Sequence, residues 1–399
     1  MSKKIGFGVL LCFAGLTVLA ASPADQEKVA SANTGFAFDL LKQITRKQPG
    51  TNVFISPFSV STALQMVGNG AAGETRAEML GVLITAGLPA ETLNAACRDL
   101  NQSLNSQPGV ILNLANAIWY KKELPLKPKF VSLNQRFFQA DLAGVDFTKP
   151  ESAQAINHWA DVRTHGKIKE VVQWPFDPDM RVILANAIYF KGKWDRSFDR
   201  QATKDHAFNV LPGGTPKRIP MMWQRGHFSY QAGSGFQAVR LPYAGGRLQM
   251  YLFLPATNST PAKLLENFSG ESWRDKILPQ FRDREGMLAL PRFKTEYEVV
   301  LNDPLKALGM KQAFAPNADF SAMASEPLFI SEVKQKSFVD VNEEGTEAAA
   351  VTTVTMVSSA MPRPGKLFEM IVDRPFLFVI ADDQTTSILF MGLIYDPEE

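Results

Sequence analysis

The most informative stretch of this sequence is residues 343–364, which read EEGTEAAAVTTVTMVSSAMPRP. Gly345 provides a flexible pivot near the start, because glycine adopts backbone conformations that other residues avoid. Three alanines follow, and then a run rich in Val and Thr without any charge, a composition that favours a β-strand. Pro362 and Pro364 cannot continue the interior of a sheet. The stretch therefore predicts a strand-forming segment between a flexible start and a fixed end.

The alternation within this stretch indicates which face could be buried. Side chains two residues apart lie on the same face of a strand, so Thr346 shares its face with every even-numbered residue up to Ser358, and none of these is charged. Glu347 lies on the opposite face. This pattern suits a strand with one face buried in a sheet. Composition alone favours a permanent strand over one that inserts only after a trigger.

The rest of the chain predicts a single domain of the α+β class. Four apolar residues at helical spacing indicate a helix near the N-terminus: Phe36, Leu40, Leu41 and Ile44. Ser56 and Pro57 are typical of a helix N-cap followed by proline in the first turn. Two similar runs, LANAIWYK at 114–121 and LANAIYFK at 184–191, predict neighbouring strands in similar surroundings. Strands are predicted at residues 110–120, 182–190, 236–254, 287–293, 328–341 and 376–394.

Composition excludes several classes of protein. The chain has 399 residues, of which 45% are hydrophobic and 21% charged, which is ordinary for a globular protein with a large core. A formal charge of +2 gives no reason to expect a nucleic acid or a membrane as partner. Two cysteines and four dispersed histidines have no metal-ligand spacing, so neither a metal nor a cofactor is predicted. GNGAAG at 68–73 matches a dinucleotide fingerprint only by letter, since no strand pattern precedes it.

The N-terminus predicts a secretory signal peptide over residues 1–21. Two lysines precede a short apolar run, and small residues favour cleavage after Ala20 or Ala21. A membrane anchor is the less favoured alternative, because a span needs about 20 apolar residues and this run is shorter. The mature chain, residues 22–399, would then be secreted as one domain. Its only cysteine would be Cys97, so it would have no internal disulfide.

Eight short motifs occur in a fixed order along the chain. They are NVFISPFS at 52–59, the segment 157–171, NAIYFKGKW at 186–194, PMM at 220–222, LPRF at 290–293, LGM at 308–310, DRPFLF at 373–378 and FMG at 390–392. Together they resemble the motifs of the serpins, the serine-protease-inhibitor family. The resemblance extends over nearly the whole chain after the leader, and residues 343–364 resemble the hinge and reactive-centre loop of that family.

The resemblance implies a fold with a large central mixed β-sheet, two smaller sheets, about eight or nine helices and an exposed reactive-centre loop. It also implies a protease inhibitor and not an enzyme: the protease cleaves the loop, forms an acyl-enzyme and is trapped when the loop inserts into the central sheet. A new strand of about 12 residues could add on the order of 10–20 hydrogen bonds at about 1 kcal/mol each. That gain is comparable with the stability of a whole domain, so the native form would be trapped kinetically.

The same resemblance implies roles for individual residues. The hinge comprises Glu343, Gly345, Thr346, Ala348, Ala349 and Ala350, whose small side chains can pass between strands. Trp194 and Arg292 are expected where the loop first enters the sheet, with Arg292 paired to Glu343. A polar cluster beneath the opening strands matches Ser56, Ser59, Asn186 and Gln335. Gln335 stands where the family commonly has a histidine. Its amide donates and accepts hydrogen bonds, so the bonds are expected to persist without a histidine-linked pH effect.

The predicted reactive bond joins Ser359 to Ala360, to within one or two residues. Small residues at 358–360 indicate an elastase-like or subtilisin-like serine protease as target. Met356 or Met361 would be a less favourable cleavage site for a chymotrypsin-like enzyme. The expected partner is this protease in a covalent acyl-enzyme complex.

Other interpretations are an inhibitor of a cysteine protease, a non-inhibitory serpin that serves as a binding or storage protein, and, most remotely, an enzyme. The small hinge residues argue against a loop that never inserts. The protein is expected to be a monomer that can form loop-sheet polymers on mild heating. Residues 76–100 carry only Arg76 and Arg98 as basic residues, so no polyanion cofactor is expected.

Overall fold

The computed structural model describes residues 20–105, 109–210, 215–346 and 367–397. The helices are α1 (Pro23–Lys47), α2 (Pro57–Gly68), α3 (Gly73–Val82), α4 (Ala90–Asn105), α5 (Pro128–Phe138), α6 (Pro150–Arg163), α7 (Pro261–Leu265), α8 (Gly270–Ser272) and α9 (Asn302–Leu308). The strands are β1 (Val53–Ile55), β2 (Val110–Lys121), β3 (Asp141–Val145), β4 (Val182–Lys193), β5 (Lys204–Phe208), β6 (Lys217–Gly233), β7 (Phe236–Pro242), β8 (Leu248–Pro255), β9 (Arg282–Pro291), β10 (Phe293–Val300), β11 (Lys334–Asn342), β12 (Gly345–Thr346), β13 (Phe368–Ile371), β14 (Phe376–Asp382) and β15 (Ile388–Ile394). Within the described ranges, none of the helices combines the length and the apolar character that a membrane span requires.

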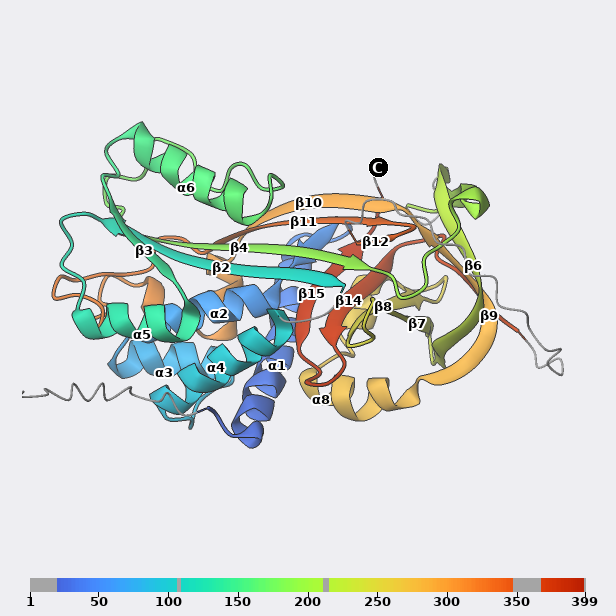
Figure 1. Cartoon of the computed structure of the whole chain (residues 1–399), viewed down its shortest axis with the longest axis horizontal. Coiled ribbons are helices and arrows are strands. Elements are labelled where there is room, and N and C mark those ends of the chain that lie inside the picture. Colours follow the sequence, from blue (N-terminus) through green and yellow to red (C-terminus); the bar gives the residue numbers. More distant parts are fainter. Residues whose placement is uncertain (1–19, 106–108, 211–214, 347–366, 398–399) are drawn as a thin grey trace, which may run out of the picture.

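Six strands form the central sheet, in the order β10-β11-β12-β4-β2-β3 (Figure 1). The β2–β3 pair is parallel and the other pairs are antiparallel, so the sheet is mixed. Helix α6 lies on one side of this sheet, and α2 to α5 lie on the other (Figure 1). The two similar sequence runs are neighbouring strands as predicted, with Asn116 of β2 opposite Asn186 of β4.

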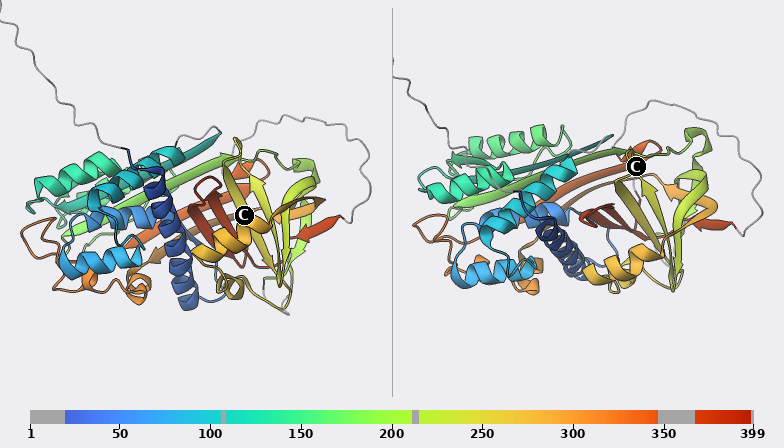
Figure 2. Two further views of the ribbon diagram at one scale, coloured as in Figure 1. Left: turned by 90° about the horizontal axis from the view of Figure 1, so that it is seen from below. Right: turned by 60° about the horizontal axis from the view of Figure 1, so that its bottom comes forward.

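The other nine strands form one network, in the order β1-β15-β14-β8-β7-β6-β9-β13 with β5 on β6. The two smaller sheets expected from the sequence are parts of this network, joined by the long strand β6, which pairs with β7 at one end and with β5 at the other. Helix α1 contacts helices of the first half and strand β15, and Figure 2 shows it between the two halves of the molecule. The α+β fold, with its large mixed sheet and two smaller sheets, is therefore confirmed, and the described ranges contain nine α-helices.

Helix α2 forms the centre of the core beneath the central sheet. Ser56 is its N-cap, as predicted, and accepts a hydrogen bond from the backbone N–H of Ser59, while Pro57 occupies the first turn. All residues of α2 are buried. Because the helix is buried all round, its position is set by packing and not by one amphipathic face.

Two strand predictions need correction. The strand predicted over 328–341 begins only at Lys334, and residues 328–333 are irregular although Leu328 and Ile330 are buried. Burial alone does not make a strand, because a strand needs successive hydrogen bonds to one neighbour, whereas Ile330 and Val333 bond singly to Ala313 and Leu301. The strand predicted to end at residue 293 is followed by a separate strand, β10, which reaches Val300. Its buried residues alternate with the exposed residues Lys294, Glu296 and Glu298, which is the pattern of a strand buried on one face, so the sequence carried this signal and the prediction missed it.

Candidate functional site

Strand β12 holds the described part of the hinge between β4 and β11. It is antiparallel to both strands: Thr346 lies opposite Gly192 on β4 and opposite Val341 on β11. Gly345 has a φ of +153°, and a Cβ atom there would collide with the carbonyl oxygen of Gly192. Only glycine therefore lets the chain enter the sheet at this point.

The side chain of Thr346 is enclosed by two aromatic residues. Thr346 is only 2% exposed, and its hydroxyl shares a hydrogen bond of 2.7 Å with the hydroxyl of Tyr243. Burial raises the pKa of Tyr243 above its usual range, so the phenol stays protonated. Trp194 stacks on Tyr243 with 4.7 Å between ring centroids, and its Nε1 donates to the carbonyl of Asn342 at 2.9 Å. Trp194 thus lies against the hinge, where the sequence analysis expected it.

The carboxylate of Glu343 anchors the turn that leads into β12. Its Oε1 accepts from Arg292 Nε at 2.8 Å, from Arg292 Nη2 at 2.6 Å and from Thr203 Oγ1 at 2.5 Å. The predicted Glu343–Arg292 ion pair is therefore present. The Glu343 side chain is only 3% exposed, and burial opposes its ionisation. The hydrogen bonds from Arg292 and Thr203 outweigh that burial and hold the pKa of Glu343 below its usual value.

The segment after β4 forms backbone hydrogen bonds to the same turn. The N–H of Trp194 donates to the carbonyl of Glu344 at 2.8 Å, and the N–H of Phe198 donates to the carbonyl of Glu343 at 2.8 Å. The Glu344 carboxylate accepts from Arg200 at 2.6 Å. The turn cannot shift its register without breaking these bonds, so the register of β12 is fixed.

Gln335 and Ser56 form a reciprocal pair beneath the sheet. Gln335 Nε2 donates to the carbonyl of Ser56 at 2.9 Å, and the Ser56 N–H donates to Gln335 Oε1 at 3.1 Å. The Ser56 hydroxyl donates to the carbonyl of Leu389 at 2.7 Å. The glutamine amide thus makes both kinds of hydrogen bond, as predicted, and the cluster links β11 with α2 and β15.

Asn186 belongs to a separate pair. Its Nδ2 donates to Asn116 Oδ1 at 2.6 Å, across the β2–β4 boundary. Asn186 Oδ1 and Ser59 Oγ are buried and have no hydrogen-bond partner among the described groups. The cluster expected from the sequence is therefore divided, and one acceptor on β4 is unsatisfied in the native form.

Beyond β12, the boundary between β4 and β11 is incomplete. We call this boundary, between residues 182–193 and 334–342, the seam. Within the described ranges, β4 pairs with β12 only at residues 345–346, and no ladder joins β4 directly to β11. Because β12 is antiparallel to both, β4 and β11 run parallel to each other. Beyond the hinge end, β4 and β11 lie close to each other without a ladder of hydrogen bonds, so a new strand would have to separate them.

Several predicted site residues lie outside the described ranges, namely Ala348, Ala349, Ala350, Ser359 and Ala360. Conversely, the sequence analysis missed four residues that contact the site: Asn116, Arg200, Thr203 and Tyr243. Tyr243 precedes two glycines, which signals a turn but reveals nothing about Thr346, 103 residues away. Only Asn116 had a usable signal, because it occupies the same place as Asn186 in the two similar runs.

Other reactive side chains contribute nothing to the site. Cys97 is buried, and burial raises its pKa to about 12, so its thiol stays protonated and unreactive at neutral pH. In the part of the chain that the structure describes, no group of three His, Cys, Asp or Glu residues could hold a metal ion.

Comparison with known sequences gives extensive matches. The model of a family described as serpin (serine protease inhibitor) matches residues 31–397. The leukocyte elastase inhibitor of Bos taurus is 38% identical over 383 residues, covering 93% of this chain and 100% of that protein. A serpin-like protein of Thermococcus kodakarensis is 38% identical over 384 residues, covering 94% of this chain and 87% of that protein.

Solved structures agree with these matches. Tengpin, a thermophilic serpin in its native state, has a TM-score of 0.86 at 27% identity, covering 95% of this chain and 96% of that chain. Human thyroxine-binding globulin in complex with its ligand has a TM-score of 0.84 at 26% identity, covering 94% and 100%. The chain belongs to the serpin family, a family of serine protease inhibitors.

Proposed function

We propose that this serpin is a suicide inhibitor of a serine protease, which it traps covalently when its cleaved reactive loop inserts into the central sheet. The observation that carries the proposal is β12, where two hinge residues already form a strand antiparallel to both β4 and β11. If the chain after Thr346 continued in that register while β4 and β11 moved apart, it would fill the seam.

Continuing this register gives each loop residue an expected position. On β11 the odd-numbered residues from Gln335 to Val341 are buried, and residues directly opposite each other share a face of the sheet. The even-numbered loop residues, which begin with Thr346, would therefore face the core. This is the uncharged set that the alternation in the sequence selects, so insertion would bury no charge on the inner face.

Thr352 would satisfy an orphaned acceptor. The continued register brings it opposite Asn186 on β4 and opposite Gln335 on β11. Its hydroxyl could donate to Asn186 Oδ1, which has no partner among the described groups of the native form. A buried polar atom without a partner costs about 1–3 kcal/mol. Satisfying this atom on insertion supports the inserted form as the state of lower free energy.

The chemistry at the loop would be ordinary acyl transfer up to the last step. The hydroxyl oxygen of the protease's serine would bond to the carbonyl carbon of Ser359, and the Ser359–Ala360 bond would break. The proton would go to the leaving amine of Ala360. Water would normally hydrolyse the ester, but insertion would drag the attached protease along the sheet and distort its active site before hydrolysis.

The target class follows from the side chains around the proposed bond. Ser358, Ser359 and Ala360 are small, which suits the narrow specificity pockets of elastase-like enzymes and the broad specificity of subtilisin-like ones. The relatives that bear the name leukocyte elastase inhibitor support the first of these. A cysteine protease could form the corresponding thioester and is the alternative target.

One observation favours a second candidate, a serpin that binds a ligand and traps no protease. The fold matches thyroxine-binding globulin almost as well as it matches Tengpin, so the fold alone does not separate carriers from inhibitors. The small hinge residues after Glu343, including the glycine at the entry to the sheet, favour the inhibitor.

The proposal is tested by mixing the purified protein with elastase, subtilisin, chymotrypsin and trypsin, followed by denaturing gels and sequencing of the released peptide. We expect a denaturant-resistant complex with elastase or subtilisin and a peptide that begins within one or two residues of Ala360. The loop-cleaved protein should also unfold at much higher denaturant concentration than the native protein. Cleavage without any complex, together with no gain in stability, would contradict insertion and favour the carrier.

We also propose that the protein is secreted as a monomer after removal of residues 1–21. Helix α1 begins at Pro23 and has Ser22 as its N-cap, so the first helix needs no residue of the proposed leader. This start of α1 supports a removable leader. N-terminal sequencing of the exported protein tests the leader, and native gels after mild heating test the expected loop-sheet polymers.

A further inference from the structure

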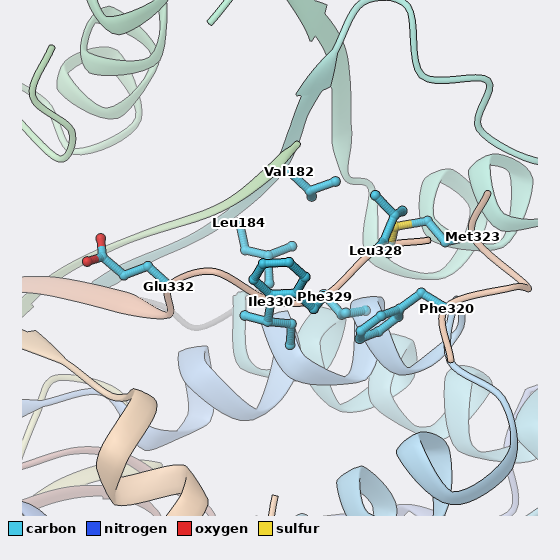
Figure 3. Close-up of a pocket in the computed structure, with 9 residues that line it drawn as sticks. Val182, Leu184, Phe320, Met323, Leu328, Phe329, Ile330 and Glu332 are labelled. Carbon is cyan, nitrogen blue, oxygen red and sulfur yellow. The ribbon is translucent and has the colours of Figure 1, made fainter. Parts of the chain in front are cut away.

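Two hollows of the described structure differ in size and in charge. The first lies beneath the start of β4, has a free volume of about 20 Å³ and is lined mainly by apolar side chains such as Leu184 and Phe320 (Figure 3). The second, here called the arginine pocket, lies at the start of β9 and has a volume of about 490 Å³. Both charged residues that line it, Arg282 and Arg284, are cations. The first hollow is too small for a ligand, whereas the arginine pocket offers two positive charges to one.

The two arginines share one face of β9. Side chains two residues apart point to the same face of a strand, and both arginines are exposed. Arg282 Nη1 donates to the carbonyls of Pro279 and Phe281 at 2.6 and 2.8 Å, which fixes this side chain. Arg284 makes no hydrogen bond or ion pair with another residue that the structure describes. Its guanidinium is therefore available to a partner.

The acidic residues of the same stretch lie on the opposite face, where each has a basic neighbour. Asp283 Oδ2 lies 3.0 Å from His227 Nδ1, and Glu285 Oε1 lies 3.2 Å from Arg225 Nη2. Glu369 of β13 also points away from the pocket, because its neighbour in the chain lines the pocket. No carboxylate is among the described residues that line it. β9 thus has one face with cations and carboxylates together and one face with cations alone.

An aromatic pair forms a wall of the arginine pocket. Phe368 of β13 stacks on Tyr230 of β6, with ring centroids 4.0 Å apart. The Phe368 ring covers Gly286 on β9, where a Cβ atom would collide with it. The Tyr230 hydroxyl donates to Gln237 at 3.0 Å, which holds the second ring. The two rings exclude water from one side of the pocket, so an ion pair formed there is screened less than in open solvent.

The arginine pocket lies where the chain enters β13. Strand β13 is parallel to β9 and begins opposite Gly286, so residues 282–285 extend beyond it on the side from which the chain arrives. Ala360 is eight residues before Phe368, a span of at most about 29 Å. A protease domain of roughly 220 residues has a radius of gyration of about 17 Å. A protease bound at the proposed reactive bond would therefore reach this pocket.

We propose that the arginine pocket is a second binding site for the target protease, in which Arg284 and Arg282 bind a carboxylate on the protease surface outside its active site. The inference rests on the proposed function and adds a source of selectivity to it. A guanidinium holds a carboxylate through two parallel hydrogen bonds. Two cations match one acidic side chain, whereas an extended polyanion needs a longer row of them.

This contact acts on the encounter and not on the trapping step. Complementary charges at the edge of an interface raise the association rate more than the final affinity. The small residues at 358–360 suit more than one class of protease, so the loop by itself discriminates little between them. A protease with a carboxylate in reach of the arginine pocket would be inhibited faster than one with the same specificity and no such carboxylate.

The test compares Arg284→Gln with Arg225→Gln, its matched control. Both variants lose one positive charge, but Arg225 lies on the opposite face and already pairs with Glu285. The second-order rate constant of inhibition is measured with the protease that the unchanged protein traps, in about 50 mM and about 500 mM NaCl. At low salt we expect Arg284→Gln to lower the rate about two- to fivefold and Arg225→Gln to change it by less than about 1.5-fold. The difference should nearly vanish at high salt, where the Debye length is only about 4 Å.

Two further variants separate charge from other effects. Arg284→Lys keeps the charge and should retain most of the rate, whereas Arg284→Glu reverses the charge and should lower the rate about tenfold at low salt. The number of inhibitor molecules consumed per protease inactivated should stay the same in all variants. The unfolding midpoint of the native form should also stay the same, because Arg284 supports no described contact of the fold.

Equal rates for Arg284→Gln and the unchanged protein at low salt would overturn the site, and so would equal losses for the two glutamine variants, while the trapped complex still formed and the proposed function stood. Altered consumption at an unchanged rate would also overturn it, because Arg284 would then act on insertion. Heparin that accelerated the unchanged protein but not Arg284→Gln would assign the pocket to a polyanion and contradict the proposal. If no protease were trapped at all, the proposed function would fall and this inference with it.

Discussion

The two edges of β4 differ completely. Along one edge it pairs with β2 without interruption, from Val182 opposite Tyr120 to Gly192 opposite Val110. Along the other, among the residues that the structure describes, it pairs only with the two residues of β12. The same strand is thus hydrogen-bonded to its neighbour along the whole of one edge and only at the hinge end of the other. The comparison teaches that the capacity for rearrangement belongs to a boundary between strands, and is not a property of the strand itself.

The physical difference lies in the backbone groups. Along the β2 edge these backbone groups are hydrogen-bonded throughout, so we expect this edge to contribute equally to the stability of the native and the loop-inserted forms. Along the seam, no ladder joins the described edges of β4 and β11, and an unpaired strand edge is a template for another strand. The hinge end of the seam is fixed by Glu343, Trp194 and Tyr243, so the register of an entering strand is decided before it enters.

The largest effect is expected from a charge at the hinge end of the seam. Thr346→Arg would bury a cation between β4 and β11 beside Tyr243, at a cost on the order of 3–5 kcal/mol. Insertion should slow at least 100-fold, which turns the inhibitor into a substrate that is cleaved without being trapped. The number of inhibitor molecules consumed per protease inactivated, measured on gels, reports this change.

Thr346→Ser is the control for that prediction, because it keeps the hydroxyl that meets Tyr243 at 2.7 Å. It should inhibit almost as well as the unchanged protein. Normal trapping by the arginine variant would show that the strand enters elsewhere, and it would contradict the conclusion that the edge of β4 next to β11 receives the strand.

The closed edge should behave in the opposite way. Ile118 of β2 is fully buried, and Ile118→Ala leaves a cavity that costs about 2–5 kcal/mol. Because β2 keeps its neighbours when the seam fills, we expect equal losses in the native and the loop-cleaved forms. Denaturant unfolding of both forms checks this, and a loss confined to one form would contradict the separation of the two edges.

A smaller, pH-dependent effect is expected at the anchor of the hinge. Since the pKa of Glu343 is held below its usual value of 4.5, its ionised form stabilises the fold above that pH. The stabilisation is lost as the pH falls through the lowered folded-state pKa. Glu343→Gln should therefore cost about 1.5–3 kcal/mol at pH 7 and progressively less below pH 4.5.

The comparison for this prediction is Glu344→Gln. Its partner, Arg200, is 57% exposed, so solvent screens the ion pair and the loss should stay under about 1 kcal/mol. Unfolding midpoints between pH 3.5 and pH 7.5 distinguish the two variants. A loss for Glu343→Gln that did not change with pH would show that packing, and not ionisation, anchors the turn.

The smallest effect is expected from introducing a titratable group at Gln335, in the polar cluster with Ser56. Gln335 has no titration near neutral pH, and Gln335→His would introduce a group with an ordinary pKa near 6.5. Because the site is buried, protonation there should be unfavourable, and stability should fall as the pH drops below about 6.5 by at most 1.4 kcal/mol per pH unit. The rate of heat-induced polymerisation at pH 5.5 and pH 7.5 should differ only in the variant.

Several features were predictable because they depend on local chemistry. The N-cap at Ser56 follows from a hydroxyl before a proline, and the pairing of β2 with β4 follows from two runs of matching sequence. The amide chemistry of Gln335 was sufficient to predict that it donates and accepts in the cluster. The Glu343–Arg292 ion pair was expected from the family resemblance and not from their spacing.

Other features were not predictable, because they depend on which distant segments meet. The apolar residues within 328–333 indicated a strand, yet the backbone there makes single hydrogen bonds to Ala313 and Leu301 and joins no ladder. Tyr243 contacts Thr346 only because the turn between β7 and β8 reaches the end of β4. Asn116, not Gln335, became the partner of Asn186 because β2 lies directly beside it.

The sequence by itself determined which residues could form an insertable strand. The uncharged alternate face of residues 346–358, the glycine before it and the prolines after it are properties of the chain, whatever surrounds it. Only the tertiary structure decided where that strand would fit, because its place is set by two other strands that share no ladder beyond β12. The unpaired boundary between β4 and β11 and the register fixed at Thr346 both arise from packing between segments that are remote in sequence.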